Sequence, residues 1–395
     1  MTAATGAESS TQRSSVLALQ VVVASFLALR LYMHLGADPF GDETYYWLWG
    51  QKLGLSYFDH PPFHAWLLRL VSAVFGWNQL SVRILTWFTL AGTLWIFWLW
   101  SKRLAPADPR RFFWQAAAVY LASPLFFALT LVSYNDHLLV FLCLASAHAF
   151  LTFADRYEAR APGHLRWLYL GAGLLGLAVL TKYNAVFLGL GLGLFVLIRP
   201  QLRPLLRNPH LYLAAALAIA TQAPVFYWNL SEGFASYNFH FSERWGATSA
   251  ARPANLMAPV NFLVITANSL SPFLVWPLFK FLFGRAEGAF EALAKPLAVS
   301  ILAVSTVTLC AVSIWLGAYF YWNIVAFIAV MPLLVRWLGS RFQLWLHLSF
   351  GLVAAALVAF NFSVMPLGCA AGRPRRRLGR QLRVAGGDFS GARRR

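Results

Sequence analysis

Charged side chains are scarce in this sequence of 395 residues. Asp, Glu, Lys and Arg make up 12% of it, and hydrophobic residues make up 59%, with a mean hydropathy of +0.59. Soluble globular domains carry roughly 25% charged residues. This balance excludes an ordinary soluble domain, and the sequence predicts an all-α polytopic membrane protein.

Cysteine is also rare. The three cysteines, Cys143, Cys310 and Cys369, lie far apart, and two of them lie inside apolar runs. This spacing provides neither a disulfide framework nor the ligand spacing of a zinc site. We expect these cysteines to be small apolar packing residues.

Acidic residues are fewer than basic ones, with 14 Asp and Glu against 32 Lys and Arg, and the net charge is +18. Such a charge is typical of nucleic-acid-binding proteins, but its distribution here differs. Nine arginines and one acid, Asp388, follow Gly372. Most other basic residues lie in short loops between apolar runs, the pattern that orients membrane proteins. We therefore expect membrane lipids and no nucleic acid as partners.

The apolar runs predict about eleven membrane spans. They cover residues 15–35, 80–100, 112–132, 138–154, 211–229, 256–282, 296–315, 321–337 and 344–362, with two short spans in 167–198 on either side of Thr181–Asn184. Residues 1–14 are polar and predict a disordered N-terminus. Residues 62–77 predict a short helix on the membrane surface. Arg30 is expected to snorkel to the interface.

Counting the spans places the basic loops on one side and every acidic or histidine cluster on the other. The second side gathers segment 38–66, the turns at Asp136 and Lys182, and loop 230–256. Ionisable groups at membrane ends are costly to desolvate and therefore indicate function.

Other interpretations of these groups stay open. Asp136 can cap a helix and Lys182 can snorkel. His240 can be a loop histidine without a role, and Arg244 can form a weak surface pair with Glu243.

Segment 38–66 has the densest pattern. Tyr45, Tyr46 and Trp49 follow Asp42 at spacings of three, four and seven, so one helical face carries a carboxylate and then aromatic rings. Two prolines, at 61 and 62, prevent a helix from continuing. Such a platform suits a sugar-binding site, whereas aromatic anchoring at lipid headgroups is the alternative.

The C-terminal segment, residues 366–395, is not expected to form a domain. The span count puts it on the outer side, although its arginines oppose that placement. Either one span is miscounted, or the natural C-terminus was lost, for example through a change of reading frame. We favour the second explanation.

These motifs resemble a known family. The segments GDETYYW at 41–47 and YFDHPP at 57–62, with Trp66, resemble the first external loop of the glycosyltransferases related to dolichyl-phosphate-mannose protein mannosyltransferases and to the lipid A aminoarabinose transferase. Later motifs are SYND at 133–136, LTKYNA at 180–185, and FHF at 239–241 with Arg244. The resemblance covers roughly residues 15–340. It implies a GT-C fold over 15–365, with the site on extracytoplasmic loops.

The resemblance also implies an activity, namely transfer of a sugar from a polyprenyl-phosphate donor to a hydroxyl of a lipid, protein or glycan. The expected setting is a bacterial inner membrane, with the site facing the periplasm. A non-catalytic remnant of the family is the first alternative, and a transporter or flippase is the second.

Roles follow residue by residue from the resemblance. Asp42 matches the catalytic carboxylate, with Glu43 and Asp136 as further catalytic candidates. The donor phosphate and substrate are assigned to Tyr45, Tyr46, His60, Lys182, Tyr183 and Arg244. Asp59 and His240 match positions that can hold a divalent metal ion. No nucleotide or organic cofactor is expected.

Overall fold

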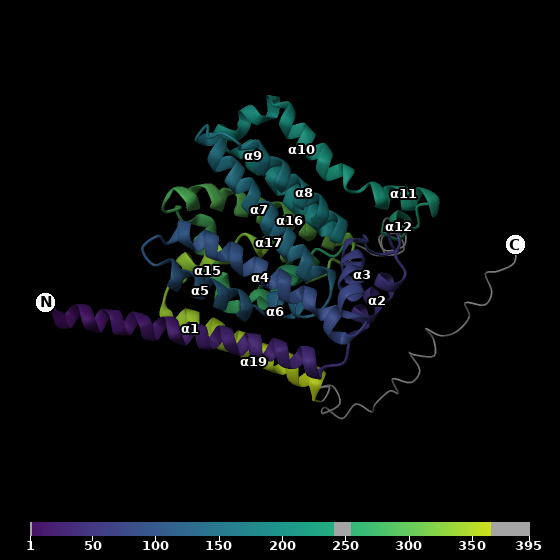
Figure 1. The fold of residues 1–395 in the computed structure, drawn as a ribbon. Coiled ribbons are helices and arrows are strands. Elements are labelled where there is room, and N and C mark those ends of the chain that lie inside the picture. The colour runs from purple at the N-terminus through teal and green to yellow at the C-terminus, as the bar shows by residue number, and fades with distance from the viewer. Residues whose placement is uncertain (1, 241–253, 365–395) are drawn as a thin grey trace, which may run out of the picture.

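Helices account for all the regular structure in the described part of the chain (Figure 1). The computed structural model describes residues 2–240 and 254–364, and of residues 2–13 only the backbone. The prediction of an all-α fold is confirmed. The segment 365–395 lies outside the described residues, as does Arg244.

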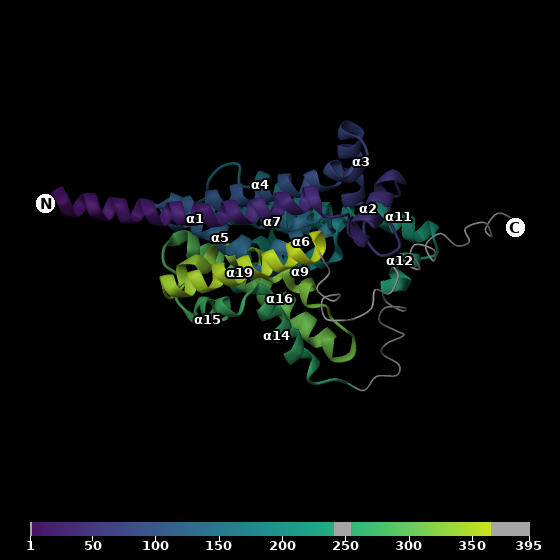
Figure 2. The same ribbon diagram turned by 90° about the horizontal axis from the view of Figure 1, so that it is seen from below.

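Within the described residues, five helices are long and apolar enough to cross a membrane unaided. The helix α7 is the most buried of them and packs against α4 and α8, whereas α1 and α19 are the least buried and lie side by side at the edge of the bundle (Figures 1 and 2). Their bounds are α1 Thr2–Gly36, α4 Gln79–Leu104, α7 Asn135–Glu158, α16 Ala289–Trp315 and α19 Arg341–Ser363.

Five further apolar segments are bent pairs of helices. In each pair, a proline stands at the first or second position of the second limb. Proline starts a helix well but cannot continue one. Four of these segments therefore turn within a predicted continuous span, whereas the bend at Pro200 lies in the basic loop predicted after residue 198. The pairs are α5 Pro109–Ala122 with α6 Pro124–Leu131, η1–α9 Tyr183–Ile198 with η2 Pro200–Arg207, α10 Pro209–Ala220 with α11 Ala223–Ser231, α14 Ala258–Leu270 with η4–α15 Pro272–Phe283, and η5–α17 Phe320–Ile328 with α18–η6 Met331–Trp337.

Four shorter helices complete the described elements: α2 Gly41–Gln51, α3 Phe63–Phe75, α8 Leu165–Thr181 and α12 Ala235–Asn238. With the bent pairs, up to ten spans can cross a bilayer. The eleventh predicted span corresponds to α8, whose 17 residues are fewer than the roughly 20 that usually cross. The short helix expected within 62–77 is present as α3.

The first helix differs from the prediction at two places. Residues 2–13 continue α1 as helix where a disordered segment is expected; they contain alanines and no proline, and adding residues to an existing helix is easier than nucleating one. Arg30 does not snorkel, since it is fully buried and donates to the backbone carbonyls of Thr86 and Thr130. Thr130 lies in the last turn of α6, where backbone carbonyls have no hydrogen-bond partner within the helix, and Arg30 supplies one.

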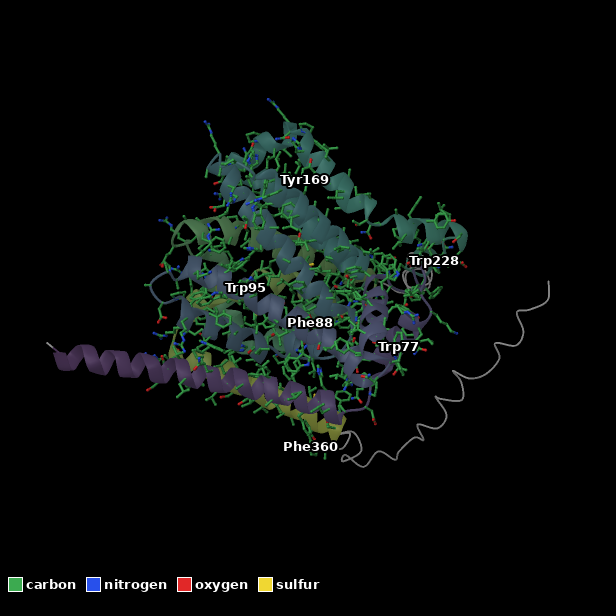
Figure 3. The ribbon with its side chains drawn as sticks, in the orientation of Figure 1. Trp77, Phe88, Trp95, Tyr169, Trp228 and Phe360 are labelled. Carbon is green, nitrogen blue, oxygen red and sulfur yellow. The ribbon has the colours of Figure 1, made fainter. Side chains whose placement is uncertain are left out.

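Large apolar side chains face outward around the bundle. Phe88 and Trp95 on α4 are each 61% exposed, and Phe360 on α19 is exposed as well (Figure 3). Exposing so many large apolar side chains to water would be unfavourable, whereas lipid chains can pack against them. Together with the apolar helices, it identifies an integral membrane protein.

Ion pairs join helix ends on the basic side of the molecule. Arg103 of α4 pairs with Asp155 of α7, and Arg199 after α9 pairs with Glu158. Arg336 pairs with Glu287 and Glu291, at the start of α16. The prediction that acidic clusters lie only on the opposite side is therefore wrong, because these carboxylates compensate the arginines of the same side.

Candidate active site

The helix α2 brings Asp42 to the wall of a cavity. The helix begins after Pro39-Phe40, and Asp42 and Glu43 occupy its first turn, where the helix dipole favours negative charge. Tyr46 and Trp49 are buried and pack on each other, and Trp49 stacks flat on Tyr57 at 4.2 Å. These two rings pack inside the protein instead of anchoring in lipid.

The cavity has a volume of about 660 Å³ and collects most of the predicted site. It lies where α2, the start of α7, the end of α8 and η5 meet. The predicted residues that line it are Asp42, Tyr46, His60, Asp136, Lys182, Tyr183 and His240. Its remaining walls include apolar side chains such as Leu129, Phe187 and Leu309. It therefore combines a polar end with an apolar part.

Asp136 and Lys182 form a buried ion pair. The Lys182 Nζ donates to both carboxylate oxygens of Asp136, each at 2.8 Å. Asp136 stands in the first turn of α7 and Lys182 follows the last turn of α8, so the antiparallel packing of these helices brings them together. The Nζ also lies 5.3 Å from the ring centre of Tyr321. Lys182 is thus buried and paired, and it does not snorkel.

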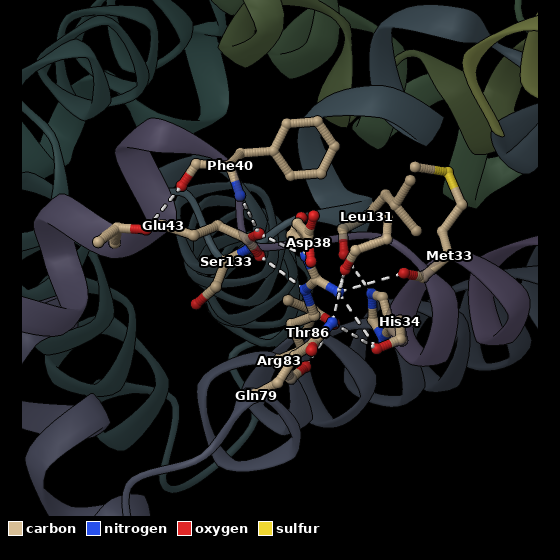
Figure 4. A network of polar contacts seen from close by, with 12 residues as sticks. Met33, His34, Asp38, Phe40, Glu43, Gln79, Arg83, Thr86, Leu131 and Ser133 are labelled. Carbon is tan, nitrogen blue, oxygen red and sulfur yellow. Dashed lines mark hydrogen bonds and ion pairs between the residues drawn. The ribbon is translucent and has the colours of Figure 1, made fainter. Parts of the chain in front are cut away.

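Glu43 points away from the cavity, although it follows Asp42 directly. Its two oxygens accept from Arg83, at 3.1 and 2.7 Å, and also from the backbone N–H groups of Phe40 and Ser133. The carboxylate is fully buried (Figure 4). These contacts bind both oxygens of Glu43 to groups outside the cavity, and Glu43 is not among the residues that line it.

Arg83 joins three chain segments through one guanidinium group (Figure 4). It donates to Glu43 on α2 and to backbone carbonyls in the last turn of α1 and just after it, those of Met33, His34, Ala37 and Asp38. Because Glu43 also accepts from Ser133, this network fixes α2 against the turn before α7. It thereby holds Asp42 and Asp136 on the walls of the same cavity. The sequence analysis does not single out Arg83, because an arginine at a span end resembles an interfacial anchor.

Tyr45 does not line the cavity but bonds Asp59, the residue before His60 in the cavity wall. Its hydroxyl donates to Asp59 Oδ1 at 3.2 Å, and burial, followed by the nearby Asp59 carboxylate, raises the Tyr45 pKa to about 12. Burial and the carboxylates of Asp136 and Asp42 also raise the pKa of Tyr46. Both phenols therefore remain protonated hydrogen-bond donors at neutral pH.

The two predicted metal ligands do not form a ligand set. His240 Nε2 contacts the backbone carbonyl oxygen of Asp59 at 3.1 Å, whereas the Asp59 carboxylate faces Tyr45. Within residues 2–240 and 254–364, no three His, Cys, Asp or Glu side chains cluster as metal ligands do. In the part of the chain that the structure describes, Asp59 and His240 thus belong to no three-residue cluster of metal ligands, and their assignment to a divalent ion stays a prediction.

Further residues of the cavity wall were missed by the sequence analysis. Tyr321 and Trp322 stand at the start of a predicted span, where aromatic residues usually indicate a membrane interface. Asn184 donates to the Trp322 carbonyl at 3.0 Å and joins η1 to η5. The run of two aromatics and an asparagine at 321–323 is the signal that could have identified them.

Comparisons with known proteins find a matching family model and a curated relative. A family model described as dolichyl-phosphate-mannose-protein mannosyltransferase matches residues 59–228. The lipid A galacturonosyltransferase RgtD of Rhizobium johnstonii is 26% identical over 366 residues, which cover 87% of this chain and 70% of that protein.

Solved structures share the fold. ArnT from Cupriavidus metallidurans, bound to undecaprenyl phosphate, matches with a TM-score of 0.61 at 16% identity, over 86% of this chain and 62% of that chain. The archaeal oligosaccharyltransferase AglB from Archaeoglobus fulgidus matches with a TM-score of 0.52 at 11% identity, over 89% of this chain and 56% of that chain. This chain thus spans less than two thirds of either solved protein.

The sequence match and the fold agree with the motifs around Asp42, Asp136 and Lys182. The chain is therefore similar to the dolichyl-phosphate-mannose-protein mannosyltransferase family over residues 59–228, and its fold is that of the membrane glycosyltransferases ArnT and AglB.

Proposed function

We propose that this protein transfers a sugar from a polyprenyl-phosphate donor to a hydroxyl of lipid A or a related envelope lipid. One observation carries the proposal: Asp42 shares a cavity of about 660 Å³ with the Asp136–Lys182 pair. The similarity to a lipid A galacturonosyltransferase supports a lipid acceptor. A lipid-phosphate donor is supported by the fold match to ArnT bound to undecaprenyl phosphate.

In the proposed reaction, Asp42 is the general base. The acceptor hydroxyl attacks the anomeric carbon and loses its proton to the Asp42 carboxylate, while the bond from that carbon to the phosphate oxygen breaks. Asp42 suits this role because its carboxylate lines the cavity, whereas that of the neighbouring Glu43 is held by Arg83.

The leaving phosphate needs hydrogen-bond donors and positive charge. Lys182 has three donor hydrogens, and its two bonds to Asp136 leave one for a phosphate oxygen. Tyr46 is a protonated donor on the same wall, and His60 lies beside it. We assign Arg244, outside the described residues, to the same anion by its place in the motif. The apolar wall suits the prenyl chain.

The proposed setting is a bacterial inner membrane with the cavity facing the periplasm. The arginine-rich helix ends lie on the side opposite to the cavity, as expected when they face the cytoplasm.

An assay with purified protein tests this function. Undecaprenyl-phosphate sugars are supplied one at a time with lipid A, and mass spectrometry follows the acceptor. We expect one donor to add a hexose- or pentose-type mass to lipid A, and Asp42→Asn to slow the addition by about 10²–10⁴-fold. The acceptor assignment is wrong if a protein or glycan acceptor is modified instead. The activity itself is wrong if no polyprenyl-phosphate sugar is consumed with any acceptor.

A further inference from the structure

A second cavity lies among α7, α8, α9, η2 and α10 and has a volume of about 290 Å³. Among the described residues that line it, Tyr212 alone carries a polar side-chain group, and its hydroxyl already donates to the carbonyl of Leu206. This cavity therefore suits a hydrocarbon chain and offers little to a polar ligand. Its volume is near the lower end of the roughly 300–1,000 Å³ of small-molecule sites.

The two cavities share no lining residue. On α8, Val179 lines the first cavity and Leu175 lines the second, four residues of helix away, a rise of about 6 Å. On α9, Phe187 lines the first cavity, and Gly189 and Val196 line the second. The second cavity thus lies toward the arginine-rich ends of these helices.

The mouth of this cavity opens on the outer surface. Tyr212 is 59% exposed although it lines the cavity, and Leu206 is 38% exposed. Gly193 of α9 is exposed too, and a Cβ added there would meet no atom within 4 Å. In a membrane protein, such an opening between apolar helices faces lipid chains.

Positive charge stands beside the mouth. The segment η2 leaves α9 at 109° and is amphipathic: Leu202 and Leu205 are buried in the cavity wall, while Arg203 and Arg207 are exposed. Arg199 already pairs with Glu158, but within the described residues neither Arg203 nor Arg207 has a carboxylate partner. Two neighbouring arginines without carboxylate partners, near a membrane surface, attract anionic lipid headgroups.

We propose that this cavity binds one acyl chain of an anionic phospholipid of the basic-side leaflet, with the lipid phosphate held by Arg203 and Arg207. Such a ligand needs apolar walls for its chain, an opening toward lipid for its entry, and positive charge at the mouth for its phosphate. The second cavity provides all three. The proposal does not depend on the reaction proposed above.

Binding to the purified full-length protein tests the proposal, with phosphatidylglycerol and phosphatidylcholine of identical chains as probes. Native mass spectrometry after delipidation should give a Kd about tenfold lower for phosphatidylglycerol, because two arginines near the headgroup favour a lipid with a net negative charge. The Arg203→Ala/Arg207→Ala double variant should bind both lipids equally, and no more tightly than the unaltered protein binds phosphatidylcholine.

The acyl-chain part is tested by filling the cavity. Gly193→Phe should remove binding of both lipids at this site, and Gly193→Leu should weaken it. Gly173→Phe is the matched control, because Gly173 lies on α8, lines neither cavity and also has open space at its Cβ. Equal binding by the Gly193→Phe and Gly173→Phe variants, or equal affinity of the unaltered protein for the two lipids, would overturn the proposal.

Discussion

At the scale of single residues, Asp42 and Glu43 are adjacent in the sequence but face different surroundings. Asp42 lines the larger cavity, whereas Glu43 is buried and accepts two bonds from Arg83. Successive helical residues point about 100° apart, so α2 cannot present both carboxylates to one substrate. Neutralising Asp42 should therefore affect turnover, whereas neutralising Glu43 should affect stability.

Asp42→Asn should lower the transfer rate by about 10²–10⁴-fold, the usual contribution of a general base, and leave thermal stability unchanged. Glu43→Gln should instead destabilise the protein by about 3–5 kcal/mol, because it leaves the buried Arg83 charge without its partner. Turnover and thermal unfolding of both variants in detergent check this. If Asp42→Asn kept full turnover while Glu43→Gln was stable but inactive, Glu43 would be the general base and Asp42 would not.

Asp136 and Lys182 should behave as one unit. Asp136→Asn leaves a buried ammonium unpaired, and Lys182→Met leaves a buried carboxylate unpaired, so each should cost about 3–5 kcal/mol of stability. The double variant removes both charges and should cost less than the sum. A double-mutant cycle on thermal stability measures this coupling, and strictly additive losses would contradict it.

The buried imidazole of His64 should make the protein sensitive to acid. Burial, the largest cause, lowers the His64 pKa from 6.5 to about 4, and its Nε2 contacts His137 Nε2 at 3.3 Å. Between pH 6.5 and 4 the unfolded chain binds a proton at this position that the folded protein does not, so stability falls as the pH falls.

His64→Gln should reduce this slope by up to about 1.4 kcal/mol per pH unit, measured from thermal unfolding between pH 7 and 4.5. His164→Gln, at a partly buried histidine beyond the far end of α7, is the control and should leave the slope unchanged. An unaltered slope in His64→Gln would mean that other groups control the acid sensitivity.

At the scale of elements, the loop after α2 is held by one tyrosine. Tyr57 stacks on Trp49, donates to the carbonyls of Trp49 and Lys52, and accepts from the Gly54 N–H. These contacts join residues 52–57 to α2, the helix that carries Asp42.

Tyr57→Phe should keep the stacking but lose these hydrogen bonds, at a net cost of about 0.5–1.5 kcal/mol for each. The loop should then open more often, and tryptic cleavage after the exposed Lys52 should become about fivefold faster or more. Tyr212→Phe, on α10, is the matched control and should leave cleavage at Lys52 unchanged. A cleavage rate in Tyr57→Phe equal to that of the unaltered protein would assign the loop's order to the stacking alone.

The helices show what the sequence could predict and where it could not. Apolar runs locate the spans well, because lipid requires about 20 apolar residues and helical hydrogen bonding. The bends were missed, since a proline such as Pro124 or Pro272 hardly changes the mean hydropathy of its run although it ends the helix. The motifs around Asp42 and Lys182 located the cavity, but Arg83 has no motif of its own, and its role depends on carbonyls from a different helix.

At the scale of the whole molecule, the cavity and the arginine-rich helix ends lie at opposite ends of α7 and α8. Asp136 and Lys182 stand at one end, and Asp155 with Glu158 at the other, in contact with Arg103 and Arg199. The arginines of short loops determine orientation in the membrane, so this end is expected in the cytoplasm.

Single cysteines placed in a cysteine-free background test this orientation. Lys52 after α2 and Glu232 after α11 are exposed near the cavity, whereas Arg160 after α7 and Gln201 in η2 are exposed near the ion pairs. A maleimide that cannot cross membranes should label the Lys52→Cys and Glu232→Cys variants in spheroplasts, and should reach Arg160→Cys and Gln201→Cys only after permeabilisation. The reverse pattern would put the site in the cytoplasm. If Lys52→Cys and Glu232→Cys were labelled from different sides, the end of α11 would lie on the side of the membrane opposite to the cavity. The assignment of Arg244, in loop 230–256, to the donor phosphate would then be wrong.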